Sequence, residues 1–453
     1  MQLLINPGTH SCLNMGDLAM LQVAYDRVRG LWPDAAVRVL TADSAALESF
    51  CPGAIPVPVT GLHQWNAEHP LLGQRGKLLP APLRGIVRRL EHRLQESGPA
   101  AALALMQRRY KRQGGGPDDL RSFLRALTSS DLVMMCGQGS ITDDLKPHAR
   151  QALGLLLWAQ QLGIPTVVMD QGMGPLEDLQ LLALARTAFP RVKLVTIRER
   201  PMGAPLLSRL GVSGDRVRVT GDAAVEMARR LTPERLGSGI GLSVRVVTYA
   251  NMARSLIDIL RPAIHSFARE HRAPLVAIPI MRGTKVPDTV SIEDLCSGYE
   301  GAIRGGAELV TPEFTASAVH ACRIVVTGTY HAAVFALSQG VPTVCLTNSE
   351  YYAGKFNGLA DQFGVGCTVV KLDSSDVVEQ LEFAMRKSWD FAENVRGHLL
   401  ESADRQIETS LSAYRELGLL QIARHDTEPG SMVIPKSVVR RQRLAEAAAH
   451  ALG

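Results

Sequence analysis

The sequence lacks the features that mark metal-binding, membrane-spanning and nucleic-acid-binding proteins. Its seven cysteines form no CxxC pair and no zinc-type spacing. No stretch offers the ~18 uninterrupted apolar residues of a transmembrane helix. The formal net charge is only +5 over 453 residues, too weak for nucleic-acid binding without a focused basic patch. We therefore expect no metal, no other cofactor and no nucleic-acid partner.

The cysteines and the first residues both favour a cytoplasmic protein. Several cysteines lie inside apolar runs, as expected of reduced core residues. The run from Met1 to Asn6 has no basic segment before it and is too short for a signal peptide. We expect this run to be the first strand of the fold.

Length and alternating patterns predict an α/β protein of two Rossmann-like domains facing a cleft. A chain of 453 residues exceeds the usual single-domain range. Short apolar runs end in Gly, Asn or Asp and precede helical patterns, which is typical of parallel strands alternating with helices. The expected strands are 3–5, 37–40, 132–136, 166–170, 194–197 and 217–220, then 240–244, 275–280, 307–309, 324–327 and 343–346. We place the N-terminal domain at 1–236, the C-terminal domain at 237–425 and a helical tail at 426–453.

A basic segment at about 62–128 interrupts the first domain. Ten Lys or Arg residues lie between Arg75 and Arg112, against only Glu91 and Glu96. Helical patterns and several prolines indicate a partly helical insertion. The segment is either a solvated decoration of the domain or a surface for an anionic acceptor, a partner or a peripheral membrane contact.

Three small-residue turns follow predicted strands of the first domain. They contain Asn14, Gly16 and Asp17, then Gly137, Gln138, Gly139 and Ser140, and then Gly172 and Gly174. The carboxyl ends of parallel strands meet at one edge of a sheet, where backbone can approach a ligand closely. Two of the turns also have a structural interpretation. Asp17 is a typical helix cap, and Asp143 and Asp144 after the second turn either cap a helix or bind a hydroxylated acceptor or a metal.

Cationic side chains and one histidine occupy corresponding places at strand ends. Arg198 follows the strand at 194–197, and Ser243 and Arg245 follow the first strand of the second domain. A guanidinium there can hold a carboxylate or phosphate through two hydrogen bonds, although a surface ion pair is the plainer interpretation.

The strongest single pattern is the turn from Gly328 through Thr329 and Tyr330 to His331. It lies between an apolar strand and a helix of small residues that leads to Gly340-Val341-Pro342. A helix N-terminus disfavours the cationic form of histidine, so the imidazole can exchange protons near neutral pH. Lys355 follows on an expected loop that returns to the same cleft.

Taken in order, these motifs resemble those of the polysaccharide pyruvyl transferase family over about 3–30 and 130–366. The matching positions are Asn14, Gly16, Asp17, Gly137 to Ser140, Gly172, Gly174, Arg198, Ser243, Arg245, Gly328 to His331 and Lys355. The resemblance implies a glycosyltransferase-B-like fold and transfer of a pyruvyl group from phosphoenolpyruvate to sugar hydroxyls. It assigns general acid–base catalysis to His331, donor binding to Arg198 and Arg245, and assistance at the phosphate or carboxylate to Lys355. Thr329 stands where the family commonly has Arg, so the remaining cations carry more of donor recognition.

Two other functions fit the same patterns. A nucleotide-sugar glycosyltransferase would use the same cleft for a diphosphate, and a non-catalytic member would bind glycans. The expected partners are phosphoenolpyruvate, a sugar or glycoconjugate acceptor and, as a further prediction, a second copy of the chain. The sequence leaves the identity of the acceptor open.

Overall fold

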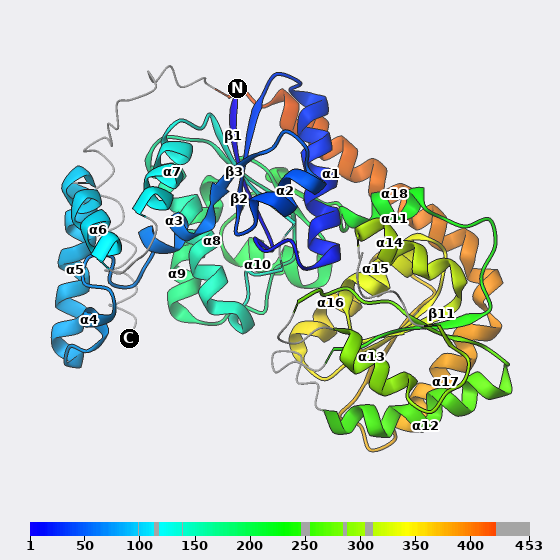
Figure 1. Ribbon diagram of the computed structural model, residues 1–453. Coiled ribbons are helices and arrows are strands. Elements are labelled where there is room, and N and C mark those ends of the chain that lie inside the picture. The colour runs from blue at the N-terminus through cyan, green and yellow to red at the C-terminus, as the bar shows by residue number, and fades with distance from the viewer. Residues whose placement is uncertain are drawn as a thin grey trace.

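The computed structural model describes residues 1–97, 99–112, 117–137, 139–245, 254–283, 288–303 and 311–422. Gln138, the expected strand at 307–309 and the expected tail at 426–453 lie outside them. The described chain forms two parallel sheets flanked by helices (Figure 1). Within these ranges no helix combines the length and the apolar character needed to cross a bilayer.

The first sheet has the strand order β3-β2-β1-β4-β5-β6-β7, and all its pairs are parallel. Its central strands are apolar runs buried on both faces, as in β4, because helices cover both sides of the sheet. The edge strand β3 was not predicted, since its two prolines disrupt a strand pattern. The strands are β1 (Gln2–Pro7), β2 (Ala36–Thr41), β3 (Ile55–Pro58), β4 (Leu132–Cys136), β5 (Thr166–Gln171), β6 (Val195–Ile197) and β7 (Val217–Val219).

The second sheet has the order β10-β9-β8-β11-β12-β13 and is also parallel. The predicted runs at 240–244, 324–327 and 343–346 are confirmed within two residues at each end. The run at 275–280 continues beyond its strand, which ends at Ala277. The strands are β8 (Gly239–Ser243), β9 (Leu275–Ala277), β10 (Ala302–Ile303), β11 (Cys322–Thr327), β12 (Thr343–Thr347) and β13 (Cys367–Lys371).

Helices follow nearly every strand, as the alternation predicts. With the first sheet they are α1 (Met15–Leu31), α2 (Ser44–Phe50), α3 (Val59–Trp65), α7 (Pro117–Thr128), α8 (Lys146–Gln161), α9 (Leu179–Ala188), α10 (Arg200–Arg209) and α11 (Ala224–Arg230). In the second half they are α12 (Arg254–Glu270), α13 (Asp288–Cys296), α14 (Pro312–Ser317), α15 (Tyr330–Ser338), α16 (Glu350–Phe363), α17 (Val377–Asp390) and α18 (Ala392–Leu419).

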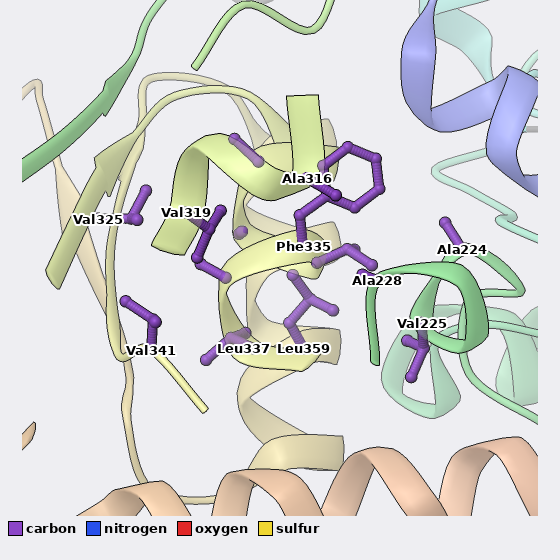
Figure 2. Packing of buried hydrophobic residues seen from close by; sticks show 14 of the residues in the cluster. Ala224, Val225, Ala228, Ala316, Val319, Val325, Phe335, Leu337, Val341 and Leu359 are labelled. Carbon is purple, nitrogen blue, oxygen red and sulfur yellow. The ribbon is translucent and has the colours of Figure 1, made fainter. Parts of the chain in front are cut away.

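One hydrophobic cluster joins the two halves and supports α15. Side chains of α11 pack toward those of α15 and α16, as Figure 2 shows for Val225, Ala228, Phe335 and Leu359. Backbone hydrogen bonds add to this joint, since Met15 N donates to Ile280 O at 2.8 Å. Every residue of α15 is buried as a result. The helix that begins beside His331 is therefore held by both halves of the chain.

The last described helix, α18, returns to the first half. Its residues Ala413, Tyr414 and Leu417 belong to the hydrophobic cluster of β1 and α1. The Tyr414 hydroxyl donates to Asp170 Oδ2 at 3.4 Å. Sequence patterns place this segment with the second domain, yet its final turns help to close the first.

The basic insertion is helical. Its helices are α4 (Gln74–Lys77), α5 (Ala81–Ser97) and α6 (Pro99–Arg112). In Figure 1 they stand at the outer side of the first half, away from α15 and α16. They are therefore not part of the surface between the two halves.

Candidate functional site

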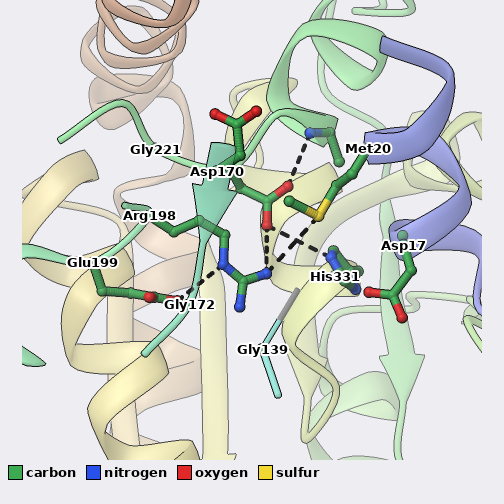
Figure 3. Close-up of polar contacts among 12 residues, drawn as sticks. Asp17, Met20, Gly139, Asp170, Gly172, Arg198, Glu199, Gly221 and His331 are labelled. Carbon is green, nitrogen blue, oxygen red and sulfur yellow. Dashed lines mark hydrogen bonds and ion pairs between the residues drawn. The ribbon is translucent and has the colours of Figure 1, made fainter. Parts of the chain in front are cut away.

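Loops at the carboxyl ends of the first sheet meet the N-terminal ends of α15 and α16 around one buried arginine. Arg198 follows β6, its exposed fraction is 1%, and its guanidinium lies 4.7 Å from the centre of the Tyr330 ring. Figure 3 shows the guanidinium close to Gly139 and Gly172. The structure thus brings together strand ends that the sequence placed at a common edge.

Asp222 joins this arginine to the histidine. Arg198 Nη1 donates to Asp222 Oδ2 at 2.9 Å, and His331 Nε2 lies 3.6 Å from the same oxygen. The second distance is that of an ion-pair contact rather than a hydrogen bond. Burial by itself raises the pKa of Asp222, but His331 and Arg198 outweigh it and hold the pKa at about 2. Asp222 is therefore a carboxylate that stabilises His331 whenever the imidazole takes a proton.

Our sequence interpretation missed Asp222. It follows β7 after Gly221, so it occupies the same kind of strand-end position as Arg198. A search for polar residues just after each predicted strand could have identified Asp222. Its backbone context also fixes its orientation, because Asp222 Oδ1 accepts from Ala224 N at 2.9 Å.

Lys355 is the second cation of the cluster, and it is partly buried. The expectation from sequence that Lys355 lies on a loop was wrong, because Lys355 lies within α16. That helix begins after the cap residue Ser349 and continues through an amphipathic run. Its Nζ lies 4.0 Å from the centre of the Tyr351 ring and 5.4 Å from that of Tyr330. Burial, and then the charge of Arg198, lower the pKa of Lys355 to about 7. Its ammonium is therefore poorly solvated and ready to pair with an anion.

Three predicted glycines are explained by these side chains. A Cβ on Gly16 would lie 1.8 Å from His331 Cγ, and one on Gly172 would lie 2.1 Å from Arg198 Nη2. A Cβ on Gly139 would lie 2.9 Å from Lys355 Nζ and 3.0 Å from Arg198 Nη2. Both cations consequently face the same backbone turn, and any larger residue there would displace them.

Some hydrogen-bonding capacity of the cluster is unused by the protein. Among the described residues, Arg198 Nε and Nη2 and His331 Nε2 have no hydrogen-bond partner. Glu199 is buried beside Arg198, with its Oε1 3.4 Å from Arg198 Nε, and burial raises the pKa of Glu199 against the opposing charges of Arg198 and Lys355. Buried donors without partners are costly unless a ligand or water satisfies them. The arrangement is suited to binding an anion next to an acid–base group.

Other predicted residues have structural partners near this cluster. Asn14, not Asp17, caps α1, since its side chain accepts from Gly16 N and Asp17 N, while Asp17 accepts from Thr9 Oγ1. At the N-terminus of α15, Ser243 Oγ lies 2.6 Å from Thr329 Oγ1, so these two hydroxyls are hydrogen-bonded to each other.

The remaining turn residues shape the backbone. Gly137 and Gly174 have positive φ angles of 56° and 87°, which favour glycine. Ser140 is buried in the turn that begins at Gly137. Asp143 accepts from the backbone N–H groups of 177 and 178, so its role there is structural.

Arg245 lies beside a different carboxylate from Arg198. Its Nε is 3.7 Å from Asp288 Oδ1, and Asp288 Oδ2 accepts from the N–H groups of Ile280 and Met281. Burial raises the pKa of Asp288 to about 6. The assignment of Arg245 to donor binding stays a prediction. Across the described ranges, no group of His, Cys, Asp and Glu side chains is placed to hold a metal ion.

Comparison with known proteins agrees with the fold and assigns the family. No curated protein matches the chain. Similar solved structures include S. aureus MnaA with UDP (TM-score 0.53, 13% identity, covering 92% of this chain and 95% of that chain). Another is a ugt transferase from Siraitia grosvenorii with UDP (TM-score 0.50, 12% identity, 92% and 98%). These likenesses confirm the glycosyltransferase-B-like fold. The family model of polysaccharide pyruvyl transferases matches residues 14–350, a range that holds Arg198, Asp222 and His331. The chain therefore belongs to the polysaccharide pyruvyl transferase family.

Proposed function

We propose that the protein transfers the pyruvyl group of phosphoenolpyruvate to hydroxyls of a sugar or glycoconjugate. The observation that carries the proposal is the pair of cations, the buried Arg198 and the partly buried Lys355, facing Gly139 beside His331 and Asp222. Phosphoenolpyruvate has a phosphate and a carboxylate, so it needs two cationic partners close to a proton-transfer group. Family membership supports the same reaction class.

Donor recognition follows from the unused donors of Arg198. Within the described part of the chain, its Nη2 has no hydrogen-bond partner and can bind an oxygen of an anionic group. Its planar guanidinium is held by Asp222 at Nη1 and lies beside Glu199 at Nε, an arrangement that lysine lacks. Lys355 supplies a point charge for a second group from across Gly139. The ring of Tyr330 lies against both cations and keeps water from them.

The reaction balances with His331 as acid and base. A first acceptor hydroxyl bonds to C2 of the donor while the imidazole takes its proton, and C3 gains a proton to become a methyl group. The C2–O bond to phosphate then breaks, and a second hydroxyl closes the ketal on C2. One hydroxyl proton ends on C3 and the other on the phosphate. Asp222 stabilises the imidazolium between these steps.

The seven cysteines support a cytoplasmic location for this chemistry. All of them are free thiols, and five are buried. Thiols persist in reducing compartments such as the cytoplasm.

Calorimetry with phosphoenolpyruvate and with UDP-sugars tests the proposal. Arg198→Ala should weaken phosphoenolpyruvate binding by at least about tenfold, because truncating a charged partner in a desolvated site costs about 2–5 kcal/mol. Arg198→Lys should recover little of the loss. Arg200→Ala is the matched control, since Arg200 lies two residues away with a 68% exposed side chain. Binding of a UDP-sugar but not of phosphoenolpyruvate by the wild type would instead identify a glycosyltransferase.

A further inference from the structure

Helix α5 of the insertion exposes an apolar stripe to solvent. Leu83, Ile86 and Leu90 are exposed by 50%, 46% and 56%. Their spacing of three and four residues puts them on one face of the helix. The opposite face carries Glu91 and Gln95, which are buried against the rest of the insertion. Large apolar side chains gathered on a solvent-facing helix mark an interaction surface.

Exposed positive charge lies around this stripe. Arg84 and Arg89 on the same helix are exposed, and Lys77 precedes it. Among the side chains described between 74 and 112, the single acidic one is Glu91, which is 4% exposed. Its carboxylate points inward, because it accepts from the N–H groups of residues 71 and 72 and lies 2.7 Å from His69 Nδ1.

We propose that the α5 surface, made of Leu83, Ile86, Arg89 and Leu90, binds an anionic phospholipid bilayer with the helix lying along the interface and with Arg84 beside it. The leucines and isoleucine would enter the boundary between headgroups and acyl chains, and the arginines would meet lipid phosphates. This inference goes beyond the proposed function and does not depend on it.

The place and charge of α5 favour a bilayer over a protein partner. The helix lies at the outer side of the first half (Figure 1). Its apolar side chains form one stripe with exposed arginines on the same helix, as in interfacial helices. Leu78, just before the helix, is 84% exposed and extends the apolar row. Bound this way, the protein would keep the surface around α15 and α16 free.

Vesicle sedimentation of the full chain tests the inference. We expect binding to mixed phosphatidylglycerol and phosphatidylcholine vesicles, little binding to phosphatidylcholine alone, and release by high salt. The variant Lys77→Gln/Arg84→Gln/Arg89→Gln should bind about a hundredfold more weakly, at about fivefold per neutralised cation. Its matched control removes three exposed cations from the second half, Lys371, Lys387 and Arg405, and should bind like the wild type.

A second variant isolates the apolar contribution. Leu83→Ser/Ile86→Ser/Leu90→Ser should lose vesicle binding while the folded protein keeps its unfolding temperature, because these side chains are already half exposed. Leu179 and Phe383, exposed by 67% and 71%, provide control substitutions to Ser.

Three results would overturn the inference. They are no binding of the wild type to anionic vesicles, unchanged binding of the two α5 variants, and self-association that the serine variant abolishes, which would assign the surface to a second copy. Activity on a soluble acceptor should be unchanged in both α5 variants, so a failure of the proposed reaction would be seen separately.

Discussion

A methyl group added at Gly139 should damage donor binding while sparing the fold. The new Cβ would lie 2.9 Å from Lys355 Nζ, 3.0 Å from Arg198 Nη2 and 3.0 Å from Tyr351 Oη. All three contacts are the ends of side chains, which can retreat by a few tenths of an ångström. The Tyr351 hydroxyl donates to Gly139 O at 2.7 Å, and that backbone acceptor remains. We therefore expect the free energy of unfolding to change by no more than about 1 kcal/mol.

The retreat would spoil the geometry with which both cations meet the donor. A charge-assisted hydrogen bond contributes about 1.5–3 kcal/mol, so Gly139→Ala should raise the Kd for phosphoenolpyruvate about ten- to a hundredfold. Gly397→Ala is the control, because Gly397 lies in α18 with open space around its Cα. Calorimetry and thermal unfolding of both variants give the two quantities. A folded Gly139→Ala protein with wild-type affinity would show that the donor does not lie between Arg198 and Lys355.

Further predictions concern the three ionisable partners of the site. His331→Gln should lower turnover by about two to four powers of ten with phosphoenolpyruvate affinity nearly kept; near-normal turnover in steady-state assays would remove the imidazole from the mechanism. Asp222→Asn should cost about 3 kcal/mol of stability in chemical denaturation, because it leaves Arg198 buried without its closest carboxylate, and an unchanged midpoint would contradict this. With the pKa of Lys355 at about 7, its ammonium is lost as pH rises, so the Kd for phosphoenolpyruvate should increase by up to about tenfold per pH unit above pH 7. Lys355→Gln should remove that dependence, and an identical pH profile in calorimetry would refute the role.

The sequence predicted the fold because the fold depends on local patterns, and the same patterns singled out Arg198 and His331 as candidate site residues. Buried strands such as β4 are continuous apolar runs, Arg198 follows a strand directly, and His331 lies in the turn and helix start after another. Position at a strand end is a local property. It was therefore sufficient to place Arg198 after a strand of the first sheet and His331 after a strand of the second.

Contacts between side chains far apart in the chain could not be predicted from the sequence. Asp222 pairs with an arginine 24 residues away and a histidine in the other half, and the spacing of charges gives no sign of either contact. Gly139 and Gly172 looked like turns that admit a ligand. Both positions need glycine because Arg198 occupies the space that a Cβ would take. Such steric reasons arise only when distant segments pack together.

Transfer of the pyruvyl group itself tests the central claim most directly. The purified chain would be incubated with phosphoenolpyruvate and a panel of sugar acceptors, with ketal formation followed by NMR and phosphate release by a colorimetric assay. We predict equal amounts of ketal and phosphate for the wild type with at least one acceptor, and neither product above background for His331→Gln. Consumption of a UDP-sugar with formation of a glycosidic bond, and no turnover of phosphoenolpyruvate with any acceptor, would contradict the account.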